Sequence, residues 1–154
     1  MRLTVWLVAL CCFSVSALGQ KSGFAEPCFS HIQGTWQEEL RKPAEADCKF
    51  FEEAQRNGAA AWENFAAEDA AMSGLSGRAQ IRSRFEKVYA KPGFRLLWFP
   101  TGGDVYGSFV VTAGNYERHS LDASGSETVS HGHYVTMWQK QKSGSYLYVW
   151  DGGE

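Results

Sequence analysis

Two histidines two residues apart, in the stretch HGHYVTMW, are the first residues whose spacing suits metal chemistry. On a strand, His131 and His133 lie on one face about 7 Å apart, as two ligands of one metal ion would. A third ligand would have to come from Glu117, His119 or Asp151, and no spacing requires that. We therefore predict no metal and no cofactor. His133 is instead a candidate general acid or base, because imidazole titrates near neutral pH.

Asp69 is a second candidate general base. It follows the stretch AAAWENFAAE, and burial there would raise the pKa of its carboxyl toward neutral. The alternative, a cap or turn contact that ends a helix, remains open. Motifs of several other enzyme classes are absent from the sequence: a nucleophile elbow, a phosphate-binding glycine loop, Cys-x-x-Cys and His-Glu-x-x-His.

Aromatic residues provide the richest candidate binding surface. The segment YLYVWD alternates aromatic with aliphatic residues, so both faces of that strand are expected to be covered. An apolar wall with a few polar groups is typical of a ligand pocket, but core packing explains the same residues. Arg118 shares one strand face with Tyr116 and could hold an anionic group. The predicted ligand contacts are Trp62, Phe65, Trp98, Tyr116, Arg118, Trp138 and Asp151.

Helical periodicity with matching stop signals predicts three helices in the first part of the chain. Pro43 stands where a first helical turn tolerates proline, and Asn57-Gly58 ends that segment. Lys91-Pro92-Gly93 ends the third segment. The helices are expected at residues 43–58, 59–70 and 76–93.

Farther along the chain the apolar period changes to two, which is typical of strands. Pro100 is expected to end a first strand, FRLLWFP, and TGGD after it is interpreted as a turn. Residues 105–120 form one long strand or two strands broken near Gly107. Helices followed by a meander of at least four antiparallel strands indicate an α+β fold with the helices on one face of a curved sheet. The last two strands are expected at 127–141 and 146–151.

The first 20 residues, MRLTVWLVALCCFSVSALGQ, have the pattern of a cleaved secretory signal: a basic start, a short apolar run and small residues. Cleavage before Gln20 is expected, with cleavage after Ala17 as the alternative. The apolar run is too short to span a bilayer comfortably. We therefore expect a secreted or periplasmic protein that has no membrane contact after cleavage.

Cleavage would divide the chain into a signal peptide at 1–19, an extended N-terminal segment at 20–43 and one domain at 44–154. Arg2 is the one charged residue of the signal, so 14 basic and 17 acidic residues would remain. This balance, with scattered Lys and Arg, does not indicate a nucleic-acid partner.

Two cysteines, Cys28 and Cys48, lie beyond the expected signal. Export makes a disulfide between them possible, and a loop of about 20 residues would gain roughly 3 kcal/mol from the bridge. A reactive thiol pair or a metal site would need a different spacing or further ligands nearby. We therefore predict a structural disulfide.

Four stretches within residues 46–153 carry motifs in a distinctive order. WENFAAEDAAMSGLSGRAQIRSRFEKVY contains Phe-x-x-x-Asp-Ala and then Gly-x-x-x-Ile. LLWFP and GNYER follow, and GHYVTMWQKQKSGSYLYVWDGG looks like a closing hairpin. Together they resemble the nuclear-transport-factor-2-like superfamily, which includes ketosteroid isomerase and SnoaL-like polyketide cyclases. The resemblance implies three N-terminal helices packed on a strongly curved antiparallel sheet. This conical cup would hold an internal pocket, and members often form a homodimer through the outer sheet face.

The resemblance to ketosteroid isomerase fails at one position that bears on catalysis. In ketosteroid isomerase the general base comes shortly after the Asp-Ala pair. At the corresponding place this chain has Met72-Ser73-Gly74-Leu75, which contains no carboxylate. The function that the resemblance implies is a secreted domain that binds an apolar or aromatic small molecule. One alternative is an isomerase- or cyclase-like enzyme acting on an apolar carbonyl substrate, with Asp69 or His133 as general base. Another is a dimerising interaction domain without a ligand.

Overall fold

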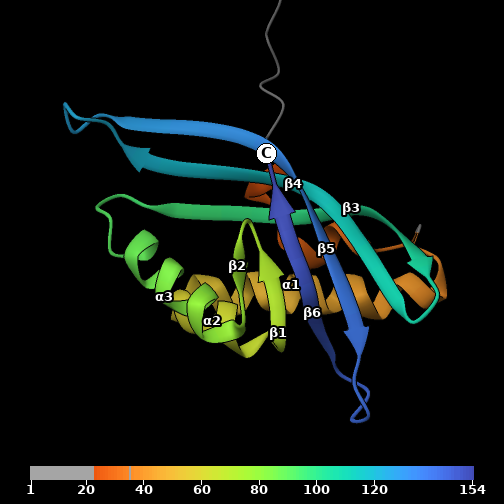
Figure 1. Cartoon of the computed structure of the whole chain (residues 1–154). Helices are drawn as coiled ribbons and strands as arrows, with labels where there is room; N and C mark the ends of the chain where they lie inside the picture. The colour runs from red at the N-terminus through yellow and green to blue at the C-terminus, as the bar shows by residue number, and fades with distance from the viewer. Residues whose placement is uncertain (1–22, 35) are drawn as a thin grey trace, which may run out of the picture.

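The computed structural model describes residues 23–34 and 36–154 of the chain (Figure 1). Within them, three α-helices lie on one side of a single curved sheet, so the expected α+β class is confirmed. The expected signal peptide lies outside the described residues and stays a prediction. No helix among the described residues is long and apolar enough to cross a membrane. The α-helices are α1 Glu38–Asn57, α2 Ala59–Asn64 and α3 Arg78–Tyr89.

The sheet has six strands in the order β2-β1-β6-β5-β4-β3 (Figure 1). Neighbouring strands are antiparallel except β1 and β6, which run parallel. The four strands β3 to β6 form the meander that the sequence predicts, and β1 and β2 extend it at the β6 edge. The strands are β1 Ala66–Met72, β2 Leu75–Ser76, β3 Arg95–Tyr106, β4 Phe109–Leu121, β5 Glu127–Lys140 and β6 Tyr146–Gly153.

Helix α1 begins five residues earlier than predicted, so residues 38–43 of the expected extended segment are helical. Pro43 lies inside the helix rather than in its first turn. Proline there removes one backbone donor, and its ring is fully buried, so packing offsets the loss. The predicted end is confirmed: Gly58 has a φ of 55° and its N–H donates to the carbonyl of Ala54 at 3.0 Å.

The second predicted helix is only half correct. Helix α2 ends at Asn64, and the alanine-rich residues after Phe65 form strand β1. Alanine favours helix by itself, but here β1 pairs with the central strand β6, and Tyr148 donates its N–H to the carbonyl of Phe65 at 2.8 Å. Pairing with a distant strand therefore overrides the local helical preference.

Strand β3 corrects another expectation, because it continues through Pro100 and the TGGD segment to Tyr106. The register shifts between Pro100 and Gly102, and β3 is an edge strand, which is where a sheet tolerates proline. The turn comes at Gly107 instead, with a φ of 61°. Of the two alternatives for residues 105–120, the break near Gly107 is therefore the observed one.

Two short 3-10 helices, Gly23–Ala25 and Cys28–Ile32, pack beside the β3 edge. The ring of His31 stacks on Phe99 of β3 with centroids 3.8 Å apart. A disulfide joins Cys28 to Cys48 on α1. The segment that was expected to be extended thus covers an edge strand and is tied to a helix, which protects that edge from pairing with another chain.

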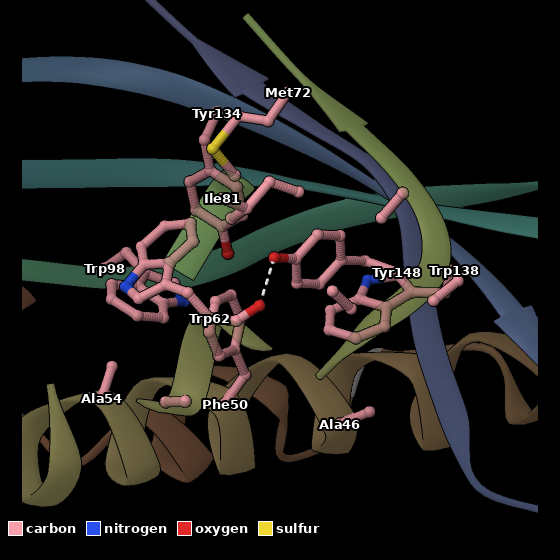
Figure 2. Close-up of a cluster of buried hydrophobic side chains, with 14 residues drawn as sticks. Ala46, Phe50, Ala54, Trp62, Met72, Ile81, Trp98, Tyr134, Trp138 and Tyr148 are labelled. Atoms are coloured by element: carbon pink, nitrogen blue, oxygen red, sulfur yellow. Dashed lines mark hydrogen bonds between the residues drawn. The ribbon is translucent and has the colours of Figure 1, made fainter. Parts of the chain in front are cut away.

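The core is a cluster of aromatic side chains between the helices and the inner face of the sheet (Figure 2). Phe50 of α1 is its centre: its ring lies 4.8 Å from Trp62 and 5.1 Å from Trp98, both edge to face. Tyr148 of β6 donates its hydroxyl to the carbonyl of Trp62 at 2.5 Å. These contacts hold helices α1 and α2 against strands β3 and β6 and set the shape of the space beside them.

Candidate functional site

A cavity of about 1020 Å³ lies beside the aromatic core, between α3 and the inner face of the sheet. Such a volume suits a small organic ligand. Its lining includes exposed side chains of α3 and the loop after β4, so the cavity opens to solvent on that side. Its aromatic lining comprises Phe50, Trp62, Phe85, Phe94, Trp98, Tyr116 and Tyr134.

Two Gly-x-Tyr sequences on neighbouring strands shape the inner wall. In the β4–β5 register, Gly114 is opposite Tyr134, and Tyr116 is opposite Gly132. A Cβ at Gly114 would lie 2.6 Å from the Tyr134 ring, and one at Gly132 would lie 2.6 Å from the Tyr116 ring. Each glycine therefore leaves room for the tyrosine of the other strand, and both tyrosines reach the cavity.

Asp47 of α1 lies fully buried behind the cavity wall. Its carboxylate accepts hydrogen bonds from Trp98 Nε1 at 2.9 Å, Thr112 Oγ1 at 2.7 Å and the Tyr134 hydroxyl at 2.9 Å. Burial raises the pKa of Asp47 to about 6, against the opposing effect of these hydrogen bonds. The side chain fixes three strands to α1 and orients Tyr134 in the wall.

The sequence analysis did not single out Asp47, although a signal was present. It stands three residues before Phe50 and seven before Ala54, on the apolar stripe of α1. A lone carboxylate on such a stripe must be buried, and a buried carboxylate needs hydrogen-bond donors. The pattern could therefore have predicted a buried acid, but not which strands supply its donors.

Asp151 of β6 is the carboxyl that faces the cavity. Thr136 donates to its Oδ2 at 2.6 Å, and no described residue bonds its Oδ1. Burial raises the pKa of Asp151 to about 7; the Thr136 hydrogen bond opposes this, and the charge of Asp47 adds to it. The carboxyl can therefore hold a proton near neutral pH and has one oxygen available to a ligand.

A β-bulge on β6 puts Asp151 in this position. Trp138 pairs with Tyr148, but the adjacent Met137 pairs with Trp150, so Val149 is the extra residue. Tyr148 is fully buried and Trp150 is 42% exposed. Strict alternation would have placed Tyr148 and Asp151 on opposite faces, whereas the bulge turns both of them inward.

Five of the seven predicted ligand contacts line the cavity, and two do not. Trp62 stacks on Phe85 with centroids 3.5 Å apart and forms part of the wall. Phe65 packs in the core instead, stacked on Phe50 at 5.2 Å. Trp138 is also core: it is fully buried and donates Nε1 to Thr112 at 2.8 Å. The five residues that line the cavity are Trp62, Trp98, Tyr116, Arg118 and Asp151.

Neither predicted general base is part of the cavity lining. His133 is exposed on the outer sheet face, where its Nδ1 lies 2.8 Å from Asn115 Oδ1. Asp69 is exposed on β1 rather than at the end of a helix. Tyr134, the neighbour of His133, has the inward position because adjacent strand residues point to opposite faces. The structure thus places neither predicted base at the cavity, where Asp151 is the buried carboxyl of the lining.

The outer face of β4 and β5 carries the histidines in a polar network. Glu117 bridges His119 Nε2 at 2.7 Å and His131 Nε2 at 2.9 Å. Glu127 Oε1 lies 2.9 Å from His119 Nδ1 and 2.8 Å from Arg95 Nη2. Burial raises the pKa of Glu117, but hydrogen bonds from the two histidines outweigh it and hold the pKa below its ordinary value. No three His, Cys, Asp or Glu side chains of the described chain are placed to hold a metal ion.

The comparison with solved structures decides the fold. A ketosteroid isomerase-like protein from Erwinia carotovora atroseptica superposes with a TM-score of 0.65 at 15% identity, over 77% of this chain and 96% of that one. A nuclear transport factor 2-like protein from Salmonella enterica gives a TM-score of 0.59 at 12% identity, over 74% and 88%. This chain has the nuclear-transport-factor-2-like fold. The fold expected from the motif order is confirmed.

The names of solved structures with this fold indicate different roles. A putative calcium/calmodulin-dependent protein kinase II association domain from Xanthomonas campestris gives a TM-score of 0.60 at 17% identity, over 76% of this chain and 87% of that one. No family model and no curated protein matches the sequence. At such identities the likeness shows the nuclear-transport-factor-2-like fold alone, so function must be argued from the cavity.

Proposed function

We propose that this protein binds a small organic molecule with an apolar body in the cavity. The observation that carries the proposal is an aromatic wall that contains one buried carboxyl, Asp151, with an oxygen free of described partners. Apolar walls supply affinity, and a single polar group in them orients the ligand. Burying about 200 Å² of ligand apolar surface would contribute roughly 5 kcal/mol before the cost of association.

Export from the cell is part of the same proposal. The signal-peptide pattern at residues 1–19 supports it, and so does the disulfide between Cys28 and Cys48. Disulfides persist in secreted and periplasmic proteins and are rare in the reducing cytosol. Detection of a mature chain that begins at Gln20 in the medium or periplasmic fraction would support export, and an uncleaved chain in the cytosol would contradict it.

The binding test uses N-phenyl-1-naphthylamine, a neutral apolar fluorophore, with the chain from residue 20 onward. Val88 of α3 lines the cavity, so Val88→Trp should narrow it and reduce the fluorescence gain. Val129 of β5 is exposed and does not line the cavity, and Val129→Trp is the matched control. We expect the control to bind like the unchanged protein. Equal binding by both variants, or no binding by the unchanged protein, would contradict the proposal.

A second candidate function is proton transfer to or from a carbonyl ligand by Asp151. The observation that favours it is the raised pKa, about 7, of a carboxyl that faces the cavity. The groups around this carboxyl are Thr136, Asp47 and the tyrosines Tyr134 and Tyr148. Asp151→Asn should abolish turnover of an enolisable ketone and leave N-phenyl-1-naphthylamine binding intact. Turnover that survives the substitution would eliminate this function.

A homodimer through the outer sheet face is also proposed. Val135 and Trp150 are exposed there at 39% and 42%, and the Trp150 ring lies over Gly152, the register partner of Val135. Exposed apolar patches of this kind mark contact surfaces. Sedimentation analysis should give a dimer mass for the unchanged chain and a monomer mass for Trp150→Glu. A monomer mass for both the unchanged chain and the variant would contradict the proposed dimer.

A further inference from the structure

We infer that the ligand is an amphiphilic anion, held by its acidic group between Arg84, Lys91 and Arg118 at the cavity mouth, with its apolar body inside. The inference rests on the proposed small-molecule binding and names the chemical class of that ligand. Carboxylic, sulfonic and phosphoric acids with an aromatic or aliphatic body share this chemistry.

The three cations come from different parts of the fold and meet at one cavity. Arg84 lies on α3, Lys91 follows that helix, and Arg118 lies on β4, and all three line the mouth and are exposed. Among the described residues none of them has an ion-pair partner within 4 Å. Exposed cations without partners remain available to an anionic group of a ligand.

The other two arginines of α3 differ from Arg84. Arg78 pairs with Glu68 at 2.9 Å, and Arg82 pairs with Glu63 and Glu86. Neither of these two lines the cavity. Of the three arginines of α3, the one that lines the mouth is therefore the one without an ion-pair partner among the described residues.

The positive mouth does not follow from overall composition, because the chain has 15 basic and 17 acidic residues. One acid, Asp122, also lines the mouth. Its Oδ1 accepts hydrogen bonds from the Ser124 hydroxyl at 2.6 Å and from the N–H groups of Ser124 and Ser126 at 2.8 and 3.0 Å. That carboxylate is thus engaged in its own turn, and three cations against one acid leave the mouth positive.

The interior fixes the orientation of such a ligand. Asp151 faces the inner part of the cavity, and Asp47 lies behind the wall. An ionised acid at the inner end would lose its hydration in a place where burial already disfavours the charged form of Asp47 and Asp151, whereas the mouth is open to solvent. The acidic group must therefore lie at the mouth. The inner end would carry a hydroxyl, a carbonyl or a purely apolar group near Asp151.

The test compares two fluorophores with the same aromatic body. 1-Anilinonaphthalene-8-sulfonate carries a sulfonate, and N-phenyl-1-naphthylamine is its uncharged counterpart. We expect the sulfonate to bind about tenfold more tightly at low salt, in keeping with a few partly screened charge pairs, and to lose most of that advantage at 0.5 M NaCl. Binding is followed by fluorescence titration of the chain from residue 20 onward.

The double variant Arg84→Gln, Arg118→Gln should bring the two affinities to within about twofold, because only the charge contact is removed. Unchanged N-phenyl-1-naphthylamine binding in the variant would show that the cavity is intact. The matched control is Arg41→Gln, since Arg41 is also exposed and unpaired but does not line the cavity. The control should keep the full preference for the sulfonate.

Two failures are distinguishable. If both probes bind the unchanged protein equally and the double variant changes neither affinity, the anionic ligand class is wrong and the small-molecule site stands. If neither probe binds, or if Val88→Trp leaves binding intact, the proposed function itself fails. A sulfonate preference that survives the double variant but falls with Arg41→Gln would place the anion elsewhere on the surface and overturn the inference.

Discussion

Titratable groups behave in opposite ways on the two sides of the sheet. On the inner face, Asp47 and Asp151 are buried with uncharged hydrogen-bond donors, and burial raises the pKa of each. On the outer face, Glu117 lies between His119 and His131, which hold its pKa below the ordinary value. The inner carboxyls favour the protonated state, and the outer one favours the ionised state.

The difference shows that residue type alone does not mark a functional site. The histidines attract attention in the sequence, but their strand parity puts them outside the cavity, where they form ordinary surface hydrogen bonds. The carboxyls of the inner face have no such conspicuous spacing in the sequence. Desolvation, which no local pattern displays, gives them their unusual protonation.

The largest expected effect is on Asp47. Asp47→Ala leaves three buried donors without an acceptor, so the free energy of unfolding should fall by about 4 kcal/mol. Urea unfolding followed by circular dichroism measures this change. Asp47→Asn keeps an acceptor oxygen and should lose less. A loss below about 1 kcal/mol for the alanine variant would show that the inner network is weak.

The next effect concerns pH and the inner carboxyl Asp151. Its pKa is about 7 in the folded protein against an ordinary 3.8, so the folded state binds more protons between these values. Stability of the unchanged protein should therefore fall, relative to Asp151→Asn, by on the order of 3 kcal/mol as pH rises from 4 to 7. Unfolding free energies of both proteins across this range test it. Parallel curves would contradict the raised pKa.

Glu117 should contribute a pH dependence of stability opposite in sign to that of Asp151. The pKa of Glu117 is lowered in the folded protein, so its contribution is present above its ordinary pKa and is lost as pH falls through the lowered pKa of the folded state. Glu117→Gln should cost about 1 kcal/mol at pH 6 and progressively less on acidification. Unfolding free energies of the unchanged protein and of Glu117→Gln across this pH range test the prediction. A cost that increases on acidification would remove the contrast between the two faces.

The smallest effect is expected for His133. Its side chain is exposed and is hydrogen-bonded to Asn115 alone among the described residues, so His133→Ala should change stability by less than about 0.5 kcal/mol. Binding of N-phenyl-1-naphthylamine and turnover of any ketone substrate should be unchanged. A large loss of either would return this histidine to the site and show that the outer face takes part in function.

The fold was accessible from sequence where signals were local. The stop at Asn57-Gly58, the apolar stripe of α3 and the period-two strands β5 and β6 all predicted the observed elements. Predictions failed at Ala66–Met72 and at Pro100, where pairing with a partner strand outweighed local preference. The pairing of β1 with β6 joins residues far apart in the chain, so no short window contains both strands, whereas β3 pairs with the next strand, β4.

From the sequence, alternation along a strand indicates which residues share a face, but it does not indicate which face is the inner one. Tyr116 and Arg118 were expected to share a face, and both line the cavity, as does Trp98, the register partner of Tyr116. His133 and Tyr134 were expected on opposite faces, but the sequence did not tell which face is inner. Strict alternation would not place Asp151 at the cavity. The extra residue Val149 forms a β-bulge, and the residues of β6 after it lie on the opposite face from the one that alternation predicts.

By itself, the sequence determined the order of the elements, the two faces of each strand and the supply of aromatic residues, because periodicity and turn chemistry are local properties. Only the tertiary structure decided which face encloses the cavity, that Asp47 and Asp151 share one interior, and that unpaired cations converge on one mouth. Desolvation and convergence depend on residues brought together from distant parts of the chain. Those contacts exist only once helices and sheet have packed.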